Sequence, residues 1–172
     1  MKSTVSLEGY KIKKILNNNV VLATQHNDEK ILFSKGIGFT NNIGDIVPNG
    51  TKIEKVFSIE DKDNSTKFNK LVSTVDNEII GISEEIIYMV GKELNEELDE
   101  KIHIALADHI AFTLNRLTKN DEIFNPFLVE TETLYKKEFE IAKKATSLLE
   151  KRTKIEIPEG GDRLHCTSYT FS

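Results

Sequence analysis

The chain has 172 residues, a net charge of −5, a hydrophobic content of 38% and a charged content of 30%, values typical of a soluble globular protein. Its apolar runs are too short to cross a bilayer and its N-terminus has no signal-peptide core, so we expect no membrane insertion and a cytoplasmic location. A single cysteine excludes an internal disulfide, and no Cys/His pairs have zinc spacing, so we expect no metal and no cofactor.

The charge is distributed unevenly along the chain. Residues 10–58 carry seven lysines against four acidic residues, a net charge of +3, whereas residues 59–172 carry −8. A small polyanion-binding module joined to an acidic partner module would have this asymmetry. Solvated charge on two unrelated surfaces would give the same totals.

The segment 10–58 consists of short apolar runs separated by clusters of asparagine, glycine and proline. We predict about four short strands in hairpin order, which form a small antiparallel sheet. A sheet of this size leaves apolar surface uncovered. A second copy of the chain would cover that surface most economically, so we expect a homodimer.

The pattern becomes helical after the polar segment Ser58–Lys67, which has the composition of a linker. Ser83 is a plausible N-cap because two glutamates, which are favourable in a first turn, follow it. Between Lys101 and Arg116 one predicted helical stripe contains Ile102, Ala105, Leu106, His109, Phe112 and Thr113.

A last long helix is predicted to begin at Asn125, with Pro126 at its first helical position. It carries two neighbouring apolar stripes, formed by Phe127, Leu134, Ile141 and Leu148 and by Leu128, Tyr135, Ala142 and Leu149. The second half is therefore predicted to be all-α. The fold class is α+β in two domains, a small N-terminal antiparallel sheet followed by a helical domain.

Three consecutive asparagines, Asn17–Asn19, interrupt a run with the composition of a strand. The simplest interpretation is a bulge or loop between two strands. Alternatively, an amide presented from a rigid sheet can hydrogen-bond base edges while nearby lysines hold phosphates. Lys14 and Asn19 are five residues apart, so an undistorted strand would show them on opposite faces, and a turn through the asparagines would let them converge.

The segment Ser34–Phe39, SKGIGF, is the second candidate element. Gly36 and Gly38 are typical of a β-bulge or a tight turn. In a functional interpretation, Lys35 binds a phosphate and Phe39 offers a stacking face to a base.

With these motifs the sequence resembles the co-antiterminator (CAT) RNA-binding domain of the BglG/LicT family of transcriptional antiterminators. The resemblance rests on four elements in the family's order and spacing: IKKILNNNVVLA, SKGIGF, GD and KIEKVF. The second half resembles the first phosphotransferase-system (PTS) regulation domain, or PRD, through ISEEII, LADHIAFTLNR and NPFLVETETLYKKEFEIA. We expect a CAT domain at 10–58, a linker at 59–69 and an incomplete PRD at 70–158.

The resemblance implies that a dimer of the small sheet binds an mRNA hairpin, the ribonucleic antiterminator, and so prevents termination in a sugar-utilisation operon. Ser34 stands where related sequences can carry glycine. By motif position, the RNA-contacting residues would be Lys14, Asn19, Lys35, Gly36 and Phe39.

His109 matches the first regulatory histidine of the family. A histidine on an apolar helical stripe is more often a core residue, but with the surrounding motif we expect it to be phosphorylated. The implied partners are the PTS phosphotransfer proteins, HPr and a sugar-specific enzyme II. We assign no role to His26, in a turn, or to His103, off the main stripe of its helix.

The tail after Pro158 departs from the family, which would continue with an acidic pair, a helix reading Gly-Phe-Ile-Ala-Leu-His and a second regulation domain. Codons for Arg163–Tyr169 can be chosen that give this same string after one base is skipped. We therefore expect residues 159–172 to be a frameshifted tail of a truncated protein; the alternative is a divergent natural C-terminus. Truncation would leave part of the stripe formed by Leu134, Ile141 and Leu148 uncovered.

We find no nucleophile–base pair and no phosphate loop, so an enzyme is not expected. The main hypothesis is an RNA-binding antiterminator in a truncated form. The alternative is a phosphoacceptor fragment that binds PTS proteins without RNA activity. A third hypothesis is a helical interaction protein with no role on RNA.

Overall fold

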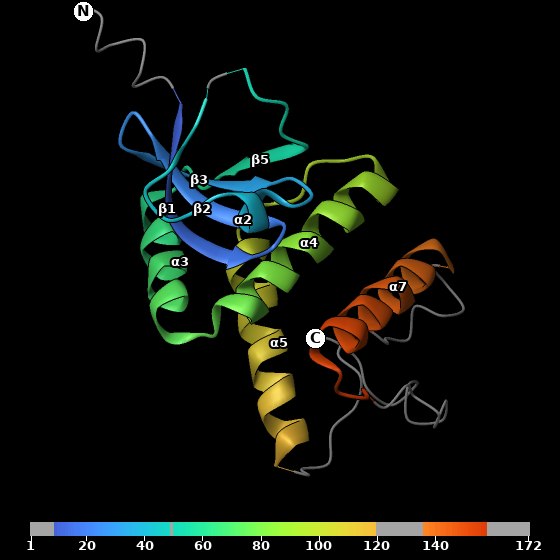
Figure 1. The fold of residues 1–172 in the computed structure, drawn as a ribbon. Coiled ribbons are helices and arrows are strands. Elements are labelled where there is room, and N and C mark those ends of the chain that lie inside the picture. Colours follow the sequence, from blue (N-terminus) through green and yellow to red (C-terminus); the bar gives the residue numbers. More distant parts are fainter. Residues whose placement is uncertain (1–8, 49, 120–135, 158–172) are drawn as a thin grey trace, which may run out of the picture.

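The computed structural model describes residues 9–48, 50–119 and 136–157, with a small sheet in the N-terminal half and helices packed beneath it (Figure 1). This order confirms the predicted α+β class. The strands are β1 (Tyr10–Asn17), β2 (Val20–Gln25), β3 (Asp28–Phe33), β4 (Ile46–Val47) and β5 (Lys55–Ser58). The helices are α2 (Ile37–Thr40), α3 (Lys62–Thr74), α4 (Asn77–Leu94), α5 (Ile102–Thr118) and α7 (Lys136–Thr153).

The sheet is antiparallel, with strand order β4-β1-β2-β3-β5. The β2–β3 turn consists of His26 and Asn27 at φ values of 53° and 68°, the left-handed conformation that a two-residue hairpin turn favours. The sequence predicted about four strands. The additional strand is β4, whose two residues pair with Tyr10 and Lys11 at the start of β1. Two residues are too few to show the alternating pattern of a strand in the sequence.

Strand β1 contains two irregularities in its pairing with β2, one between Ile12 and Lys14 and one between Ile15 and Asn17. Opposed residues share a face, so Lys14 lies on the face of Leu22, whereas Ile12 lies on that of Ala23. The bulges thereby turn both Lys14 and Asn17 toward the helices.

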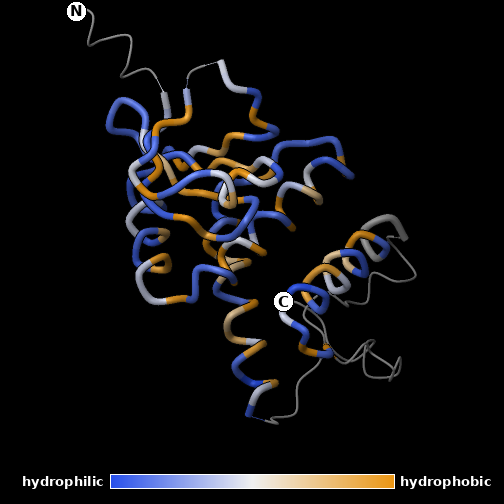
Figure 2. The backbone as a smooth tube through the Cα atoms, in the orientation of Figure 1, coloured by the Kyte–Doolittle hydropathy of each residue, from blue (hydrophilic) through white to orange (hydrophobic). Residues whose placement is uncertain are grey.

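The sheet is buried on both faces, which explains why β2 opens with four consecutive buried residues. One face forms a core of its own under α2 and β4, with Ile12, Val21, Ala23, Leu32, Ile37 and Val47. The other face packs on helices, where Leu16, Val20, Leu22 and Ile31 meet Phe68, Val72, Ile80 and Ala107. Hydrophobic stretches accordingly occur within the sheet, and others alternate with polar residues along the helices (Figure 2). The apolar surface that we expected a second copy to cover is covered by helices of the same chain.

Most of the segment 59–69, which we expected to be a linker, belongs to α3. Asp61 caps this helix by accepting a hydrogen bond from the Asn64 backbone N–H at 3.0 Å. The linker-like composition reflects an exposed first turn. Phe68 and Val72 then bury one face of α3 against the sheet.

The prediction that Ser83 caps a helix is wrong, because α4 begins at Asn77 with Asp76 as its N-cap. The Asp76 carboxylate accepts a hydrogen bond from the Glu78 backbone N–H at 2.9 Å. Ser83 lies inside the helix, fully buried, and its hydroxyl has no hydrogen-bond partner among the described residues. Asp76 is the N-cap because it lies directly before the first residues that follow the helical period.

The stripe predicted for α5 is not its buried face. His103, Ala107, Ile110, Thr113 and Leu114 are buried, whereas Ala105, His109 and Phe112 are exposed. The two stripes are adjacent on the helix and share Thr113, and hydrophobicity alone could not separate them because each contains one histidine.

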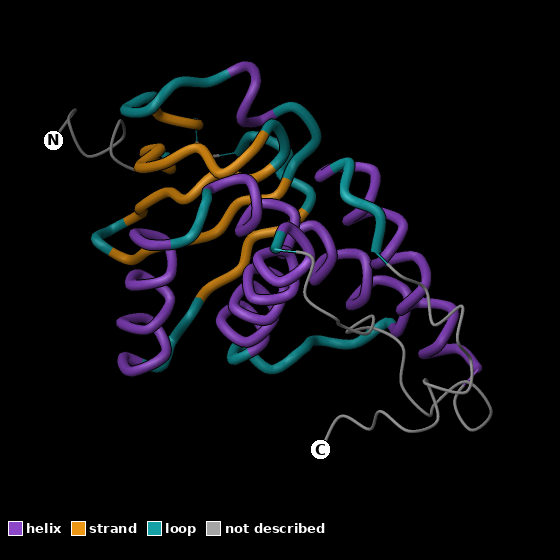
Figure 3. The backbone as a smooth tube through the Cα atoms, turned by 90° about the horizontal axis from the view of Figure 1, so that it is seen from below, coloured by secondary structure: helices purple, strands orange, loops and turns teal. Residues whose placement is uncertain are grey.

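Helix α7 packs beside α4, and the view from below places the long helices on one side of the strands (Figure 3). Ala145 and Leu149 join Ile82, Ile86, Ile110, Leu114 and Ile157 in the helical core. Ile141 is buried, so the expectation that truncation uncovers this stripe is wrong at that residue. The predicted start at Asn125–Leu128 and the tail 159–172 lie outside the described residues. No helix in the part of the chain that the structure describes could span a membrane.

Candidate RNA-binding surface

The asparagine turn and the SKGIGF segment meet, as the functional interpretation of both motifs requires. The Asn19 side-chain oxygen accepts a hydrogen bond from the Gly36 N–H at 2.9 Å, and its backbone oxygen accepts one from the Ser34 N–H at 3.0 Å. Gly38 donates to the Asn18 carbonyl at 2.8 Å. Segments that are about seventeen residues apart in the sequence thus form one rigid corner.

Two of the predicted RNA-contacting side chains project from this corner into solvent. Lys35 is exposed, and Phe39 is 78% exposed, the largest exposure among the described large hydrophobic residues. Gly36 precedes the short helix α2 with φ of 81°, a conformation that favours glycine. A cation, an aromatic face and a fixed backbone turn are therefore close together, a combination suited to phosphate and base contacts.

Lys14 and Asn19 both reach toward the helices instead of toward solvent. The Lys14 ammonium donates to the Val72 carbonyl at 2.8 Å, in the last turn of α3, where a cation is favourable. The Asn19 amide donates to Glu85 of α4 at 3.2 Å. Of the five predicted residues, two are thus exposed and two contact the helical half, while Gly36 is half-buried and bonded to Asn19.

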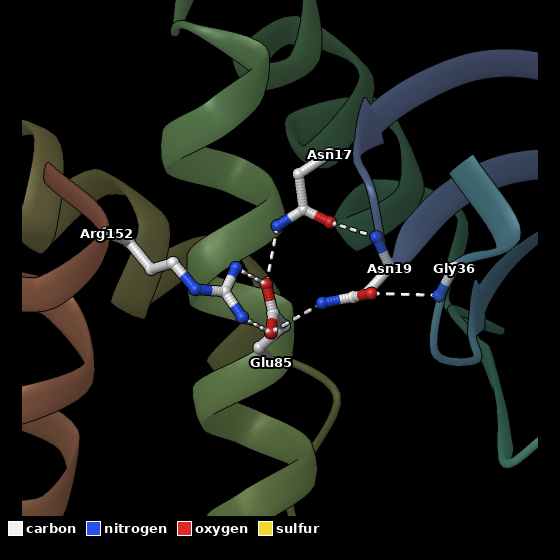
Figure 4. A network of polar contacts seen from close by, with 5 residues as sticks. All are labelled: Asn17, Asn19, Gly36, Glu85 and Arg152. Atoms are coloured by element: carbon white, nitrogen blue, oxygen red, sulfur yellow. Dashed lines mark hydrogen bonds and ion pairs between the residues drawn. The ribbon is translucent and has the colours of Figure 1, made fainter. Parts of the chain in front are cut away.

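Glu85 is the centre of the polar network that holds this second group (Figure 4). Its carboxylate, only 7% exposed, accepts hydrogen bonds from the side-chain amides of Asn17 at 2.6 Å and Asn19 at 3.2 Å. Arg152 of α7 donates to both of its oxygens at 2.6 Å, a bidentate ion pair. Asn17 also accepts the Asn19 backbone N–H at 2.8 Å and so shapes the turn.

Sequence reasoning missed Glu85 and assigned no role to Asn17. A signal was present, because two glutamates stand among isoleucines at positions where a helix buries a continuous face. Buried carboxylates are almost always paired. The partners could not be named, since Asn17 and Arg152 are far away in the sequence.

The neighbouring Glu84 forms a second buried pair, with His103 of α5. The His103 Nδ1 lies 2.7 Å and 2.9 Å from the two carboxylate oxygens. Burial raises the pKa of the Glu84 carboxyl above its ordinary value, and the hydrogen bond with His103 acts in the opposite direction. His103, to which we assigned no role in the sequence analysis, therefore has a structural one.

His109, the predicted phosphorylation site, lies on the exposed side of α5. Phe112, 56% exposed, and Arg116 lie further along the same helix, with the guanidinium 5.5 Å from the ring centroid. In contrast, His103 is buried on the other side. An exposed imidazole is accessible to a phosphate donor protein. No group of acidic, histidine and cysteine residues with the arrangement of a metal site occurs within the described ranges.

Two family models match the chain in succession. A model described as the CAT RNA-binding domain matches residues 10–66, and a model of the PRD domain matches residues 84–160. A crystal structure of GlcT CAT-PRDI matches with a TM-score of 0.67 and 36% sequence identity, over 95% of this chain and 99% of that one.

Curated relatives include the transcription antiterminator LicT of Bacillus subtilis, 37% identical over 150 residues, which are 87% of this chain and 54% of LicT. The protein GlcT of Staphylococcus haemolyticus is 35% identical over 164 residues, 94% of this chain and 58% of GlcT. The chain therefore spans just over half the length of these relatives. From the two domain matches in order and the similarity to GlcT CAT-PRDI over nearly its whole length, the chain belongs to the BglG/LicT family of transcriptional antiterminators.

Proposed function

We propose that this chain binds an mRNA hairpin through its small sheet and so prevents termination of transcription in a sugar-utilisation operon, under control of PTS phosphorylation. The observation that carries the proposal is the corner formed by Asn19 and Gly36, which is flanked along the chain by exposed Lys35 and Phe39 in the segment that matches a CAT RNA-binding domain. The chain is regulatory and has no catalytic role. Its place of action is the cytoplasm.

The two exposed side chains would contribute in different ways. Lys35 neutralises a phosphate, which makes its contribution dependent on salt. Phe39 stacks on an unpaired base, and that contribution is largely independent of salt. Asn19, Gly36 and Lys14 would complete the contact surface, as the family resemblance implies.

The test is binding of the purified chain to hairpin RNAs, selected from a pool with randomised internal loops, over a range of salt concentrations. We expect Lys35→Ala to weaken binding and to reduce the salt slope by about 1, and Phe39→Ala to weaken it with the slope unchanged. Lys101→Ala and Phe112→Ala, exposed residues of the helical half, are the matched controls. If no hairpin is selected at low salt, the RNA-binding proposal is wrong.

His109 would receive the phosphoryl group from HPr or from a sugar-specific enzyme II. Its exposure on α5 supports this role. Incubation with phosphorylated HPr should label the wild type and leave His109→Ala unlabelled, while His26→Ala, an exposed turn histidine, keeps the label. A label retained by His109→Ala would contradict the assignment.

A homodimer remains part of the proposal, although the helices cover the sheet face that first suggested it. The family resemblance supports the dimer, and exposed Ile46 lies in the edge strand β4, with exposed Ile43 three residues before it. We expect Ile46→Asp to shift the sedimentation of the chain toward the monomer. Phe112→Asp, on α5, should leave the sedimentation unchanged.

The alternative, a phosphoacceptor fragment without RNA activity, is favoured by one observation: Asn19 and Lys14 contact helices, while His109 is exposed. Asn19→Ala separates the two functions. It should abolish hairpin binding if the first holds, and it should leave phosphoryl transfer to His109 unchanged in either case.

A further inference from the structure

We infer that Glu85 competes with RNA for the side chains of the β1–β2 turn, so that this conformation is a closed, self-inhibited state of the RNA-binding surface. The inference rests on the proposed function and adds a regulatory contact to it. Glu85 presents two carboxylate oxygens to the amides of Asn17 and Asn19 at 2.6 Å and 3.2 Å. A carboxylate and an RNA phosphate or base carbonyl accept hydrogen bonds from the same amide donors.

The closed state occupies only part of the proposed surface. Asn19 and Lys14 are held against α4 and α3, whereas Lys35 and Phe39 remain exposed. RNA can therefore make a first contact with the exposed side chains. Full binding requires the turn to leave Glu85 and Lys14 to leave the Val72 carbonyl.

The contact is suited to reversible opening because Glu85 keeps a partner when the asparagines leave. Arg152 binds both carboxylate oxygens at 2.6 Å, so an opened state does not leave a buried charge unpaired. The Arg152 side chain is 30% exposed and lies on α7, so the position of that helix determines where the Glu85 carboxylate is held.

Gly81 gives an independent way to open the contact. It precedes Glu85 by one helical turn, and a β-carbon at this position would lie 2.6 Å from the Asn17 amide nitrogen. The absence of a side chain at Gly81 is what lets the asparagine turn lie against α4. Gly81→Ala would displace Asn17 by steric contact, without removing any charge.

The test compares two opening variants with two controls in the full chain. Glu85→Gln removes the charge and keeps the shape, and Gly81→Ala acts by volume alone. Glu93→Gln is the charge control, because Glu93 is also on α4, about two helical turns beyond Glu85, and pairs with Lys144 of α7 at 2.8 Å. Gly91→Ala is the glycine control, since its β-carbon would lie 3.3 Å from the Glu96 carbonyl oxygen.

Two quantities are measured: the affinity for a selected hairpin RNA, and the acylation rate of the Lys14 amine, with exposed Lys35 as an internal reference. We expect both opening variants to bind the hairpin about tenfold more tightly and to be acylated faster at Lys14. The reason is that the open state, which is competent to bind RNA, becomes more populated. The controls should match the wild type, and all variants should keep its helical circular dichroism.

The outcomes separate this inference from the proposed function. If Lys14 labelling rises while hairpin affinity stays that of the wild type, competition by Glu85 is wrong and RNA binding stands. If Lys14 labelling is unchanged in both opening variants, Glu85 does not hold the closed state, and the inference is overturned. If neither the wild type nor the opened variants bind any hairpin, the proposed function itself fails.

Discussion

The Nδ1 atom of His103 lies 2.7 Å from the Glu84 carboxylate, and both side chains are almost completely buried between α4 and α5. The ring of Phe57, from β5, meets the imidazole edge-on with centroids 4.9 Å apart, and Phe68 of α3 approaches it at 6.5 Å. One polar pair therefore lies where the sheet, α3, α4 and α5 meet.

Replacement of one member of this pair should be strongly destabilising. We expect His103→Ala to lower the free energy of unfolding by about 3 kcal/mol, because Glu84 is left buried without its partner. Urea denaturation measures the loss. The double variant Glu84→Met, His103→Leu should recover much of it, since both polar groups are then replaced by apolar ones; a double variant as unstable as the single one would contradict the explanation.

Glu100 should make the junction between β5 and α3 sensitive to acid. Its carboxylate accepts hydrogen bonds from Asn64 and from the backbone N–H groups of Glu60 and Asp61, and these lower its pKa below the ordinary value. A lowered pKa in the folded state means that the stabilisation is complete above the unfolded pKa, about 4.3, and is lost as the pH falls through the folded value.

Glu100→Gln should therefore reduce stability at pH 7 and flatten the loss of stability below about pH 4.3. Urea midpoints measured across the acid range check this. Glu96→Gln, on the same loop, is the control and should follow the wild-type curve. Parallel curves for wild type and Glu100→Gln would show that this carboxylate does not contribute to acid sensitivity.

Phe68 should be among the costliest residues to truncate. It is 2% exposed and packs among residues of the sheet and of the helices, so its removal leaves a cavity at their interface. We expect Phe68→Ala to cost about 3–5 kcal/mol. Phe112→Ala, at a residue 56% exposed, should change stability by about 0.5 kcal/mol or less. Similar losses in thermal denaturation for both variants would refute this assignment of the core.

The start of α4 provides a fourth test. Asp76→Ala removes the capping carboxylate and should cost about 1 kcal/mol. Ser83→Ala removes a buried hydroxyl that has no described partner and should be neutral or slightly stabilising. The two variants are compared by their denaturant midpoints, with an unchanged slope. If Ser83→Ala destabilised the protein more than Asp76→Ala, Ser83 would be the capping residue after all.

Local sequence information was sufficient for the class of fold and for the two segments that meet at Asn19 and Gly36, although not for their contact. Hairpin spacing and turn residues are properties of neighbouring positions, so the strands, the asparagine turn and the glycine segment could be recognised. The same information placed Lys35 and Phe39 in exposed positions consistent with their proposed roles.

The direction of Lys14 and Asn19 could not be predicted, because it depends on two bulges and on which surface the helices cover. Buried pairs such as Glu84 with His103 and Glu85 with Arg152 join residues 19 and 67 positions apart. No local period carries such information. The α5 face was mistaken for the same reason: burial of His103 follows from its partner, not from its hydrophobicity.

The two bulges in β1 also restrict how this strand can change in length. Side chains alternate between faces with a period of two, so each extra residue reverses the face of everything beyond it. Removal of Lys13, the one residue between Ile12 and Lys14, would restore plain alternation and leave Ile12 opposite Ala23 and Lys14 opposite Leu22. The strand can thus lose a residue at this bulge without moving Lys14 into the apolar core under α2, and substitutions at exposed positions likewise leave the register intact.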